Sequence, residues 1–393
     1  MLERISYNIE SMKLVIQMTK SKISMCNDET QPLPRQADCQ GYYIHCLGGF
    51  RAAKVEKDVW MVEPILEDGQ PCRKGFLKKA ELQALTHKSG LMPIAFQNFG
   101  WSEGIYYSSW SPLIPGRTNH LQGPSDLWSN VASNLARRRA GAELKDMKGT
   151  TREKVAQLLD DRSEQEWLAR SISFSLRSMD ISVERIVEFY HEQLVNLMAA
   201  GRVNGQRSTN TQDQTLYAQV HSFFLHLGAA RDYLGALIAV RIGMNPRKID
   251  CMARLIDALR PRHAGSDAIL TLLERRKCVE PVPTNPSRRQ MSGWLKEATE
   301  LRNQFIHRQP YGARHVEGFG HATAISPEMG IYRYVRPVLV DNDSDRDILN
   351  VVVSHYRKVT ELFQEAAEVS GGDISVLTLT DRDIIAVNFD AKR

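Results

Sequence analysis

The segment Leu301-Arg302-Asn303-Gln304-Phe305-Ile306-His307 contains residue types that could cleave a phosphodiester bond. Histidine, whose unperturbed pKa is about 6.5, can accept a proton at neutral pH. The Arg302 guanidinium can stabilise the negative charge that grows on phosphate oxygens, and the Asn303 amide can orient either the imidazole or the phosphate. RNA suits this set because its 2′-hydroxyl is an internal nucleophile. The expected products carry 2′,3′-cyclic phosphate and 5′-hydroxyl ends, and no metal is required.

The spacing of these residues sets a geometric condition. On an ideal α-helix Arg302 lies about 40° from Ala298, inside the apolar stripe, where an unpaired guanidinium is costly to bury. His307 lies roughly 140° around the helix from Arg302, so one straight helix does not aim both groups at one atom. They can converge if the helix ends just before Pro310, or if a second protomer supplies the opposing pair.

Three further residues are candidates for supporting roles. Asp232, one step from the apolar seam of a preceding helix, is expected to pair with Arg302. Tyr311 follows His307 by four residues and is a second candidate. Glu300 is a nearby carboxylate. It also supports an alternative interpretation, in which Arg302 and His307 have a structural role. In that case they pair with nearby carboxylates or backbone carbonyls at a helix C-terminus, where cations are favoured.

Other Arg and His residues have a similar spacing. An Arg followed by a His after four to six intervening residues occurs at Arg185/His191, Arg302/His307, Arg308/His315 and Arg314/His321. The last two pairs lead into Gly-rich chain that does not favour a helix. Arg185/His191 lies in a helical pattern, but Ile186 stands where a polar residue would be needed. It is the strongest internal competitor.

The pattern Arg302-Asn303-x-Phe305-Ile306-His307 resembles the signature of the HEPN superfamily, whose nuclease members carry Arg, a polar residue, a spacer and His on a late helix of a four-helix bundle. The resemblance covers about residues 181–370. It implies a metal-independent endoribonuclease without cofactor that acts as a homodimer on RNA, in toxin–antitoxin, abortive-infection or antiphage systems, with an antitoxin or defence partner. Members of the HEPN/MNT toxin type place a Tyr two positions after the His, where this chain has Gln309, and Tyr311 comes two residues later.

Two other functions stay open. The chain could be a catalytically silent HEPN-like module that binds RNA or nucleotide, or that scaffolds a defence complex. It could also be a regulatory interaction protein in which the Arg302/His307 motif is accidental. Cyclic-phosphate products formed in excess chelator distinguish the nuclease, and RNA affinity that falls with salt distinguishes the silent module from the third class.

The elements that must position the motif predict a mainly α fold with an N-terminal α+β part. Short β-favouring runs and one helix occupy residues 41–114, and the Pro- and Gly-rich stretch 111–126 predicts a boundary. We expect an N-terminal α+β domain at 1–126, a helical connector at 127–180, a HEPN-like antiparallel four-helix bundle at 181–370 and a terminal β-hairpin at 371–393.

Periodicity predicts the bundle helices individually. A break near Met179 and Asp180, with Ser182 as a cap, precedes one helix. An apolar seam then marks the next helix, at Leu216, Val220, Phe223, Leu227, Ala230, Leu234 and Leu237. The motif helix is followed by Pro310, and a capped start at Ser344 and Asp347 opens a last long helix.

Composition limits the remaining possibilities. The 51 Lys and Arg against 46 Asp and Glu give a net charge of only +5, so a polyanion must be met by a local basic surface. Basic runs stand at residues 137–139, 275–277 and 288–289. The first residues lack a secretory signal pattern, the longest apolar run is too short for a membrane span, and the cysteines lack paired spacing. These features predict a cytoplasmic protein without a metal site.

Overall fold

The computed structural model describes residues 39–67, 70–71, 75–102, 105–117, 122–145, 152–246, 248–340 and 343–378. The chain forms two compact units. Unit 1 comprises Met1–Trp110, Tyr190–Gln206 and His321–Val335, and unit 2 comprises Ser111–Phe189, Arg207–Gly320 and Arg336–Arg393. Strands dominate the described N-terminal part and helices dominate unit 2. The predicted mainly α fold with an N-terminal α+β part is therefore confirmed at this level, and the units divide between Trp110 and Ser111.

Unit 1 is built on a six-stranded antiparallel sheet of order β6-β3-β2-β1-β7-β8. Its strands are β1 (Cys39–Cys46), β2 (Arg51–Lys54), β3 (Val59–Glu63), β6 (Phe76–Lys78), β7 (Pro93–Ser102) and β8 (Ile105–Pro112). Alternation places Trp60 and Val62 of β3 in the core while their neighbours are less buried. Helix α2 (Lys79–Lys88) contributes Leu82 to the same core. The strands β4 (Leu66–Glu67) and β5 (Gln70–Pro71) form a separate short pair.

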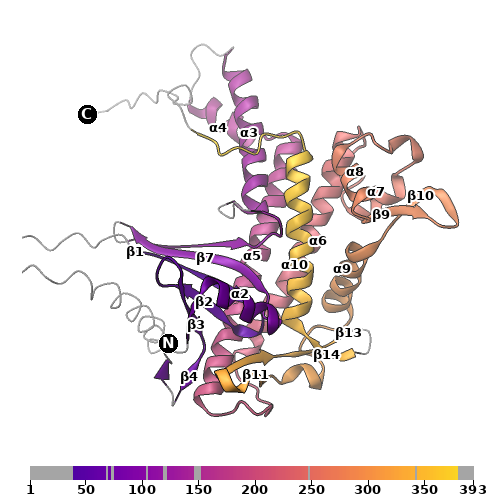
Figure 1. Cartoon of the computed structure of the whole chain (residues 1–393). Helices are drawn as coiled ribbons and strands as arrows, with labels where there is room; N and C mark the ends of the chain where they lie inside the picture. Colours follow the sequence, from indigo (N-terminus) through magenta and orange to yellow (C-terminus); the bar gives the residue numbers. More distant parts are fainter. Residues whose placement is uncertain are drawn as a thin grey trace, which may run out of the picture. The chain divides into compact units, whose positions relative to one another are not determined.

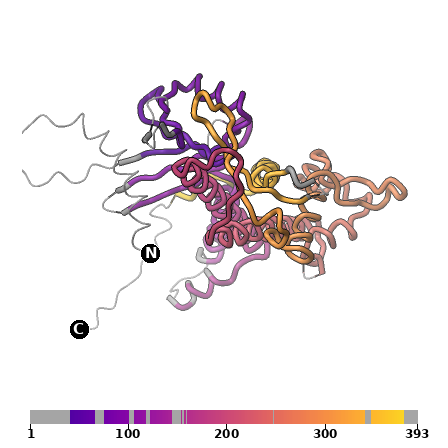
Figure 2. The backbone as a smooth tube through the Cα atoms, turned by 90° about the horizontal axis from the view of Figure 1, so that it is seen from below, coloured from indigo at the N-terminus to yellow at the C-terminus, as the bar shows by residue number. Residues whose placement is uncertain are grey.

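Two later segments of the chain complete unit 1. The hairpin of β11 (His321–Ser326) and β12 (Ile331–Val335) adds Ile331 to the core cluster of the sheet. Figure 2 shows this orange segment beside the indigo strands. The end of the long helix α5 also belongs here, where the imidazole Nδ1 of His191 lies 2.9 Å from the carbonyl oxygen of Gly49.

Unit 2 consists mainly of helices packed side by side, as Figure 1 shows for α3, α5, α6 and α10. The long helices are α3 (Pro124–Lys145), α5 (Glu164–Ala199), α6 (Asp213–Arg241) and α10 (Ile348–Val369); the shorter ones are α4 (Arg152–Asp160), α7 (Met252–Ala258), α8 (Ala268–Arg275) and α9 (Gly293–Asn303). The strands are β9 (Val279–Val282), β10 (Asn285–Met291), β13 (Pro337–Val340) and β14 (Asp343–Asp347). The predicted apolar seam is confirmed, because all seven of its residues on α6 are buried.

Helix α6 is long and apolar enough to cross a membrane by length and composition, with a mean hydropathy of 1.3 in its most apolar window. However, 67% of that window is buried inside the protein. This burial is the pattern of a core helix, and α6 contacts α7, α9 and α10.

The predicted break near Met179 and Asp180 is wrong, since α5 continues through both residues. Tertiary partners explain the continuity. The buried Asp180 carboxylate accepts hydrogen bonds from the Ser125 hydroxyl at 3.2 Å and the Tyr356 hydroxyl at 2.5 Å. The Ser182 hydroxyl donates to the carbonyl of Ser178, four residues earlier, instead of capping a helix. A domain boundary at residue 180/181 would therefore fall inside a helix.

Two other local predictions differ from the structure. The last helix is expected to open after a cap at Ser344, but it begins at Ile348 because Asp343–Asp347 forms strand β14, and the Asp347 carboxylate accepts from the backbone N–H of Arg336 at 3.0 Å. Of the predicted C-terminal hairpin, residues 371–378 contain no strand, and the remainder lies outside the described residues.

Candidate functional site

The Arg302 motif lies where helix α9 changes its winding. After Asn303 the chain continues as one π-helical turn, Gln304–Arg308, and the backbone N–H of Gln309 donates to the carbonyl of Gln304 at 2.7 Å. In a π-helix the backbone hydrogen bond links residues five apart, so its wider turn brings residues five apart closer to one side of the helix than an α-helix does. Arg302 and His307 have this spacing. Such turns occur often at functional sites.

The π-turn brings the three predicted residues together within one chain. The Nη1 atom of Arg302 lies 3.2 Å from Oδ1 of Asn303 and 3.3 Å from Nε2 of His307. The expected separation of roughly 140° is therefore wrong, because it assumed α-helical winding to the end. A second protomer is not needed to bring Arg302 and His307 into contact.

The contact between Arg302 and His307 also sets the hydrogen-bonding role of the imidazole. A guanidinium only donates hydrogen bonds, so a hydrogen bond from Arg302 requires a lone pair on Nε2 of His307. A neutral imidazole has one such lone pair, and it can take a proton from a hydroxyl group when that hydroxyl replaces Arg302 at Nε2. His307 is exposed, and Arg302 and Asn303 are partly buried, so the cluster is open to a ligand.

Arg302 carries a positive charge with no carboxylate partner among the described residues. Its Nε atom is buried and has no hydrogen-bond partner. Helix α6 makes room for the side chain at Gly228, where an added Cβ would lie 3.1 Å from that Nε. A guanidinium without a carboxylate partner favours an anionic ligand at its Nη atoms, because the anion would supply the balancing charge.

Aromatic packing holds the π-turn against α6. Phe305 is 1% exposed, and its ring centroid lies 5.2 Å from that of Phe224. After the turn, the backbone N–H of Tyr311 donates to Nε2 of His221 on α6 at 3.0 Å. Burial lowers the pKa of His221, which keeps its ring neutral and able to accept. Helix α6 therefore holds both the turn and the loop that follows it.

The three supporting candidates lie elsewhere. Tyr311 is 2% exposed, and burial raises the pKa of its phenol well above 10, so it is a packing residue. Asp232 accepts from Arg231 at 2.9 Å and from the backbone N–H of Met252 at 3.2 Å, and its predicted pairing with Arg302 is not present. Glu300 faces Lys296 at 3.9 Å on the exposed side of α9.

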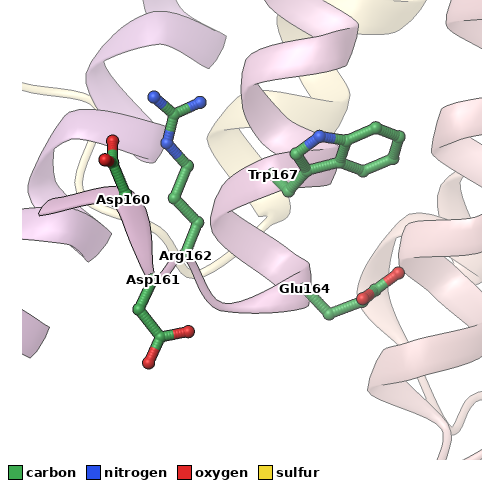
Figure 3. A pocket seen from close by; sticks show the side chains of 5 residues that line it. All are labelled: Asp160, Asp161, Arg162, Glu164 and Trp167. Carbon is green, nitrogen blue, oxygen red and sulfur yellow. The ribbon is translucent and has the colours of Figure 1, made fainter. Parts of the chain in front are cut away.

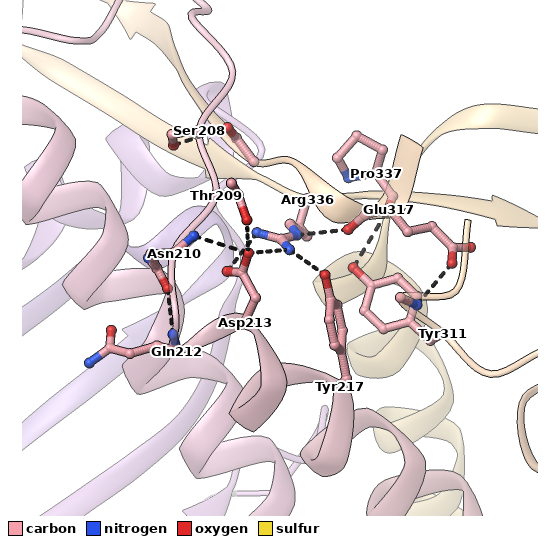
Figure 4. A network of polar contacts seen from close by, with 12 residues as sticks. Ser208, Thr209, Asn210, Gln212, Asp213, Tyr217, Tyr311, Glu317, Arg336 and Pro337 are labelled. Atoms are coloured by element: carbon pink, nitrogen blue, oxygen red, sulfur yellow. Dashed lines mark hydrogen bonds and ion pairs between the residues drawn. The ribbon is translucent and has the colours of Figure 1, made fainter. Parts of the chain in front are cut away.

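A buried polar network joins the loop after the π-turn to the start of α6 (Figure 4). Sequence reasoning did not predict this network. Arg336 is 0% exposed and pairs with both carboxylate oxygens of Asp213 at 2.9 Å. It also donates to the Tyr217 hydroxyl at 2.8 Å and to the Glu317 carbonyl at 3.0 Å. The Glu317 carboxylate accepts from the backbone N–H of Gly312 at 2.9 Å. This network ties the loop after the π-turn to the start of α6.

The competing motifs are engaged in other contacts. Arg185 is exposed and pairs with Glu188 at 2.8 Å, whereas His191 is buried against the Gly49 carbonyl. Arg314 donates to the carbonyl of Leu339 at 2.9 Å. None of these Arg residues contacts the His of its own pair among the contacts of the described residues, so the structure favours Arg302/His307.

A second candidate is an open depression between α4 and α5 (Figure 3). It is lined by Asp160, Asp161, Arg162, Glu164 and Trp167. All five residues are exposed, and none has a buried polar atom lacking a partner. In the part of the chain that the structure describes, no group of three or more His, Cys, Asp or Glu residues could hold a metal ion.

Comparison of the chain with protein-family models, curated proteins and solved structures finds no match. The interpretation of the site therefore depends on its residues and geometry alone.

Proposed function

We propose that the protein is a metal-independent endoribonuclease of HEPN type, with Arg302, Asn303 and His307 as its catalytic residues. The observation that carries the proposal is the contact of the His307 imidazole with a guanidinium that has no carboxylate partner among the described residues. The mutual contacts of α6, α9 and α10, with the motif at the end of the late helix α9, support the HEPN-like arrangement.

Each group has one role in this reaction. His307 takes the proton of the 2′-hydroxyl, whose oxygen attacks the adjacent phosphorus and expels the 5′-oxygen of the next nucleotide. Arg302 donates to the phosphate oxygens as charge grows on them, and Asn303 orients the guanidinium through its Oδ1. The leaving oxygen takes a proton from solvent or from the protonated imidazole. RNA carries the required 2′-hydroxyl and DNA does not.

The first test is cleavage of purified total RNA by the parent protein and by His307→Ala in excess chelator. A lost general base reduces the rate by about 100- to 10,000-fold, and the helical content should not change because His307 is exposed. Arg185→Ala is the matched control, since it removes the Arg of the competing motif. Equal cleavage by parent and His307→Ala proteins would reject the proposal.

We further propose that the active form is a homodimer, on grounds other than the motif. Trp167, Phe174 and Ile181 on α5 are 46%, 67% and 49% exposed, and Leu225 on α6 is 46% exposed. The α5 residues recur every seven positions on one helix face, and such apolar stripes mark protein contacts. Phe174 lies midway, so a two-fold axis through it would set Trp167 of one protomer against the partner's Ile181. Action in a toxin–antitoxin or antiphage system is part of the same proposal.

A further inference from the structure

The segment of residues 241–291, which we call the basic lobe, concentrates the positive charge of the protein. It comprises α7, the short 3-10 turn Pro261–His263, α8, β9 and β10. It contains 11 Lys and Arg against 5 Asp and Glu, a formal charge of +6, whereas the whole chain carries +5. The rest of the protein is therefore close to neutral, and a polyanion would be attracted mainly to this lobe.

Several cations of the basic lobe are not neutralised by carboxylates. Arg260 donates to the backbone carbonyls of Asp257 and Leu259 at 2.7 and 2.8 Å, and Arg262 contacts the His263 ring at 3.2 Å. Lys277 is exposed as well. Arg260, Arg262 and Lys277 form no ion pair with any residue that the structure describes. Other lobe residues, such as Arg254 with Asp250, are paired.

Helix α6 connects the basic lobe to the candidate site. Its interior Gly228 faces Arg302, and its interior Gly235 faces the backbone of Met252, where an added Cβ would lie 2.8 Å from the Cα atom. Residues seven apart lie on the same side of an α-helix about 10 Å apart, so α7 and the Arg302 site adjoin the same side of α6. Helix α9 makes a second connection, because it begins directly after β10 and carries the motif at its other end.

We infer that the basic lobe binds the backbone of single-stranded RNA that extends from the scissile phosphate at Arg302 and His307. This inference rests on the proposed function, because it assigns the rest of the same substrate to a surface. Single-strand-binding surfaces commonly engage about 4–16 nucleotides, and a basic track beside the site would hold several of them. Because the contacts are to phosphates, the binding is independent of base sequence.

The test measures binding of a fluorescently labelled single-stranded RNA of about 20 nucleotides, long enough to exceed such a site. The protein carries His307→Ala so that the RNA stays intact, and it is compared with the same protein bearing Arg260→Gln, Arg262→Gln and Lys277→Gln. Each lost phosphate contact lowers the slope of log K against log salt by about 0.7, so the expected change is about 2. At about 0.1 M salt the Kd should rise roughly 10- to 100-fold.

The matched control removes three exposed cations outside the basic lobe, by Lys88→Gln, Arg202→Gln and Arg207→Gln. This variant has the same net charge as the lobe variant, and its Kd and salt slope should stay close to the parent values. Equal losses in both variants, or no loss in the lobe variant, would overturn the inference. Failure of the proposed function appears separately, as RNA that the parent protein with His307 intact binds but does not cleave.

Discussion

The Nε atom of Arg302 faces Gly228 of α6 so closely that an added Cβ would make a tight contact with it. Gly228→Ala would place a Cβ 3.1 Å from that atom and would displace the guanidinium by a few tenths of an ångström. Because transition-state contacts depend on such distances, RNA cleavage should fall about tenfold or more. The variant should unfold at a denaturant concentration no lower than the parent, since Ala is favoured over Gly in helices by about 1 kcal/mol.

Gly141→Ala is the matched control for this substitution. Gly141 is an exposed glycine in α3, and an added Cβ would have no neighbour within 4 Å. Its variant should cleave RNA at the parent rate. If Gly228→Ala cleaves as fast as Gly141→Ala, then the position of the Arg302 side chain does not control the reaction.

Asp180 gives a pH dependence to stability. Burial raises the pKa of its carboxyl from 3.8 to about 7 in the folded protein, although hydrogen bonds from Tyr356 and Ser125 oppose the rise. A raised folded-state pKa means that the stability is fully present below pH 3.8 and is lost as the pH rises through about 7. The loss is on the order of 4 kcal/mol at alkaline pH.

Asp180→Asn should remove this penalty, because an amide keeps one acceptor for Tyr356 and can donate to Ser125. The free energy of unfolding, measured with denaturant, should already be higher in the variant by about 1–2 kcal/mol at pH 5, because the unfolded-state carboxyl ionises above pH 3.8. At pH 8 the variant should be more stable by a few kcal/mol. A difference between the two proteins that is the same at both pH values would show that Asp180 does not titrate as described.

At the scale of elements, the sequence predicts helices and strands well where the apolar pattern is continuous. The seam of α6, the last helix α10 and most strands of unit 1 follow from periodicity. The uninterrupted course of α5 cannot be predicted from periodicity. The hydrogen bonds to the Asp180 carboxylate come from Ser125 and Tyr356, which are 55 and 176 positions away in the sequence. Local propensity contains no information on such partners.

The sequence predicts which residues form the candidate site, but it does not predict how they are arranged in space. Residue types and spacing identify Arg302, Asn303 and His307, but a π-turn depends on tertiary packing of Phe305 and on the His221 contact to the following loop. One signal of the site was present in the sequence. Gly228 lies inside a long helix, where glycine is unfavourable by about 1 kcal/mol, and such a residue indicates a close approach of another group.

The Arg336 network should be necessary for the loop that follows the π-turn. Arg336→Met leaves the Asp213 carboxylate buried without its partner, which costs about 3–5 kcal/mol of stability. Asp213→Asn combined with Arg336→Met should cost less than the sum of the two single changes, since neither charge is then left unpaired. Additive losses in denaturant unfolding would contradict the coupling.

At the scale of the whole molecule, the exposed stripe on α5 predicts self-association. Phe174→Glu places a charge at the proposed two-fold axis, and light scattering should show a shift from dimer to monomer. The helical content should stay the same because Phe174 is 67% exposed. Lys296→Glu on α9, which is also exposed, should leave the mass unchanged. A parent protein that is monomeric at all concentrations would remove the basis for the dimer.

The arrangement of the site within one chain makes a separate prediction about mixtures. An Arg302→Ala protein and a His307→Ala protein should both be inactive, and mixing them should restore no cleavage, because Arg302 and His307 act from the same chain. Recovery of cleavage in the mixture would show that the two protomers share their catalytic groups.

The central claim is that His307 and Arg302 drive attack by a 2′-hydroxyl without a metal ion. The most direct measurement is to incubate the parent protein with a defined RNA oligonucleotide in excess chelator and to identify the new ends by mass spectrometry. We expect 2′,3′-cyclic phosphate and 5′-hydroxyl ends, and no cleavage at a nucleotide whose 2′-hydroxyl is replaced by hydrogen. Products with 3′-hydroxyl and 5′-phosphate ends, or cleavage only after addition of magnesium or manganese, would contradict the account.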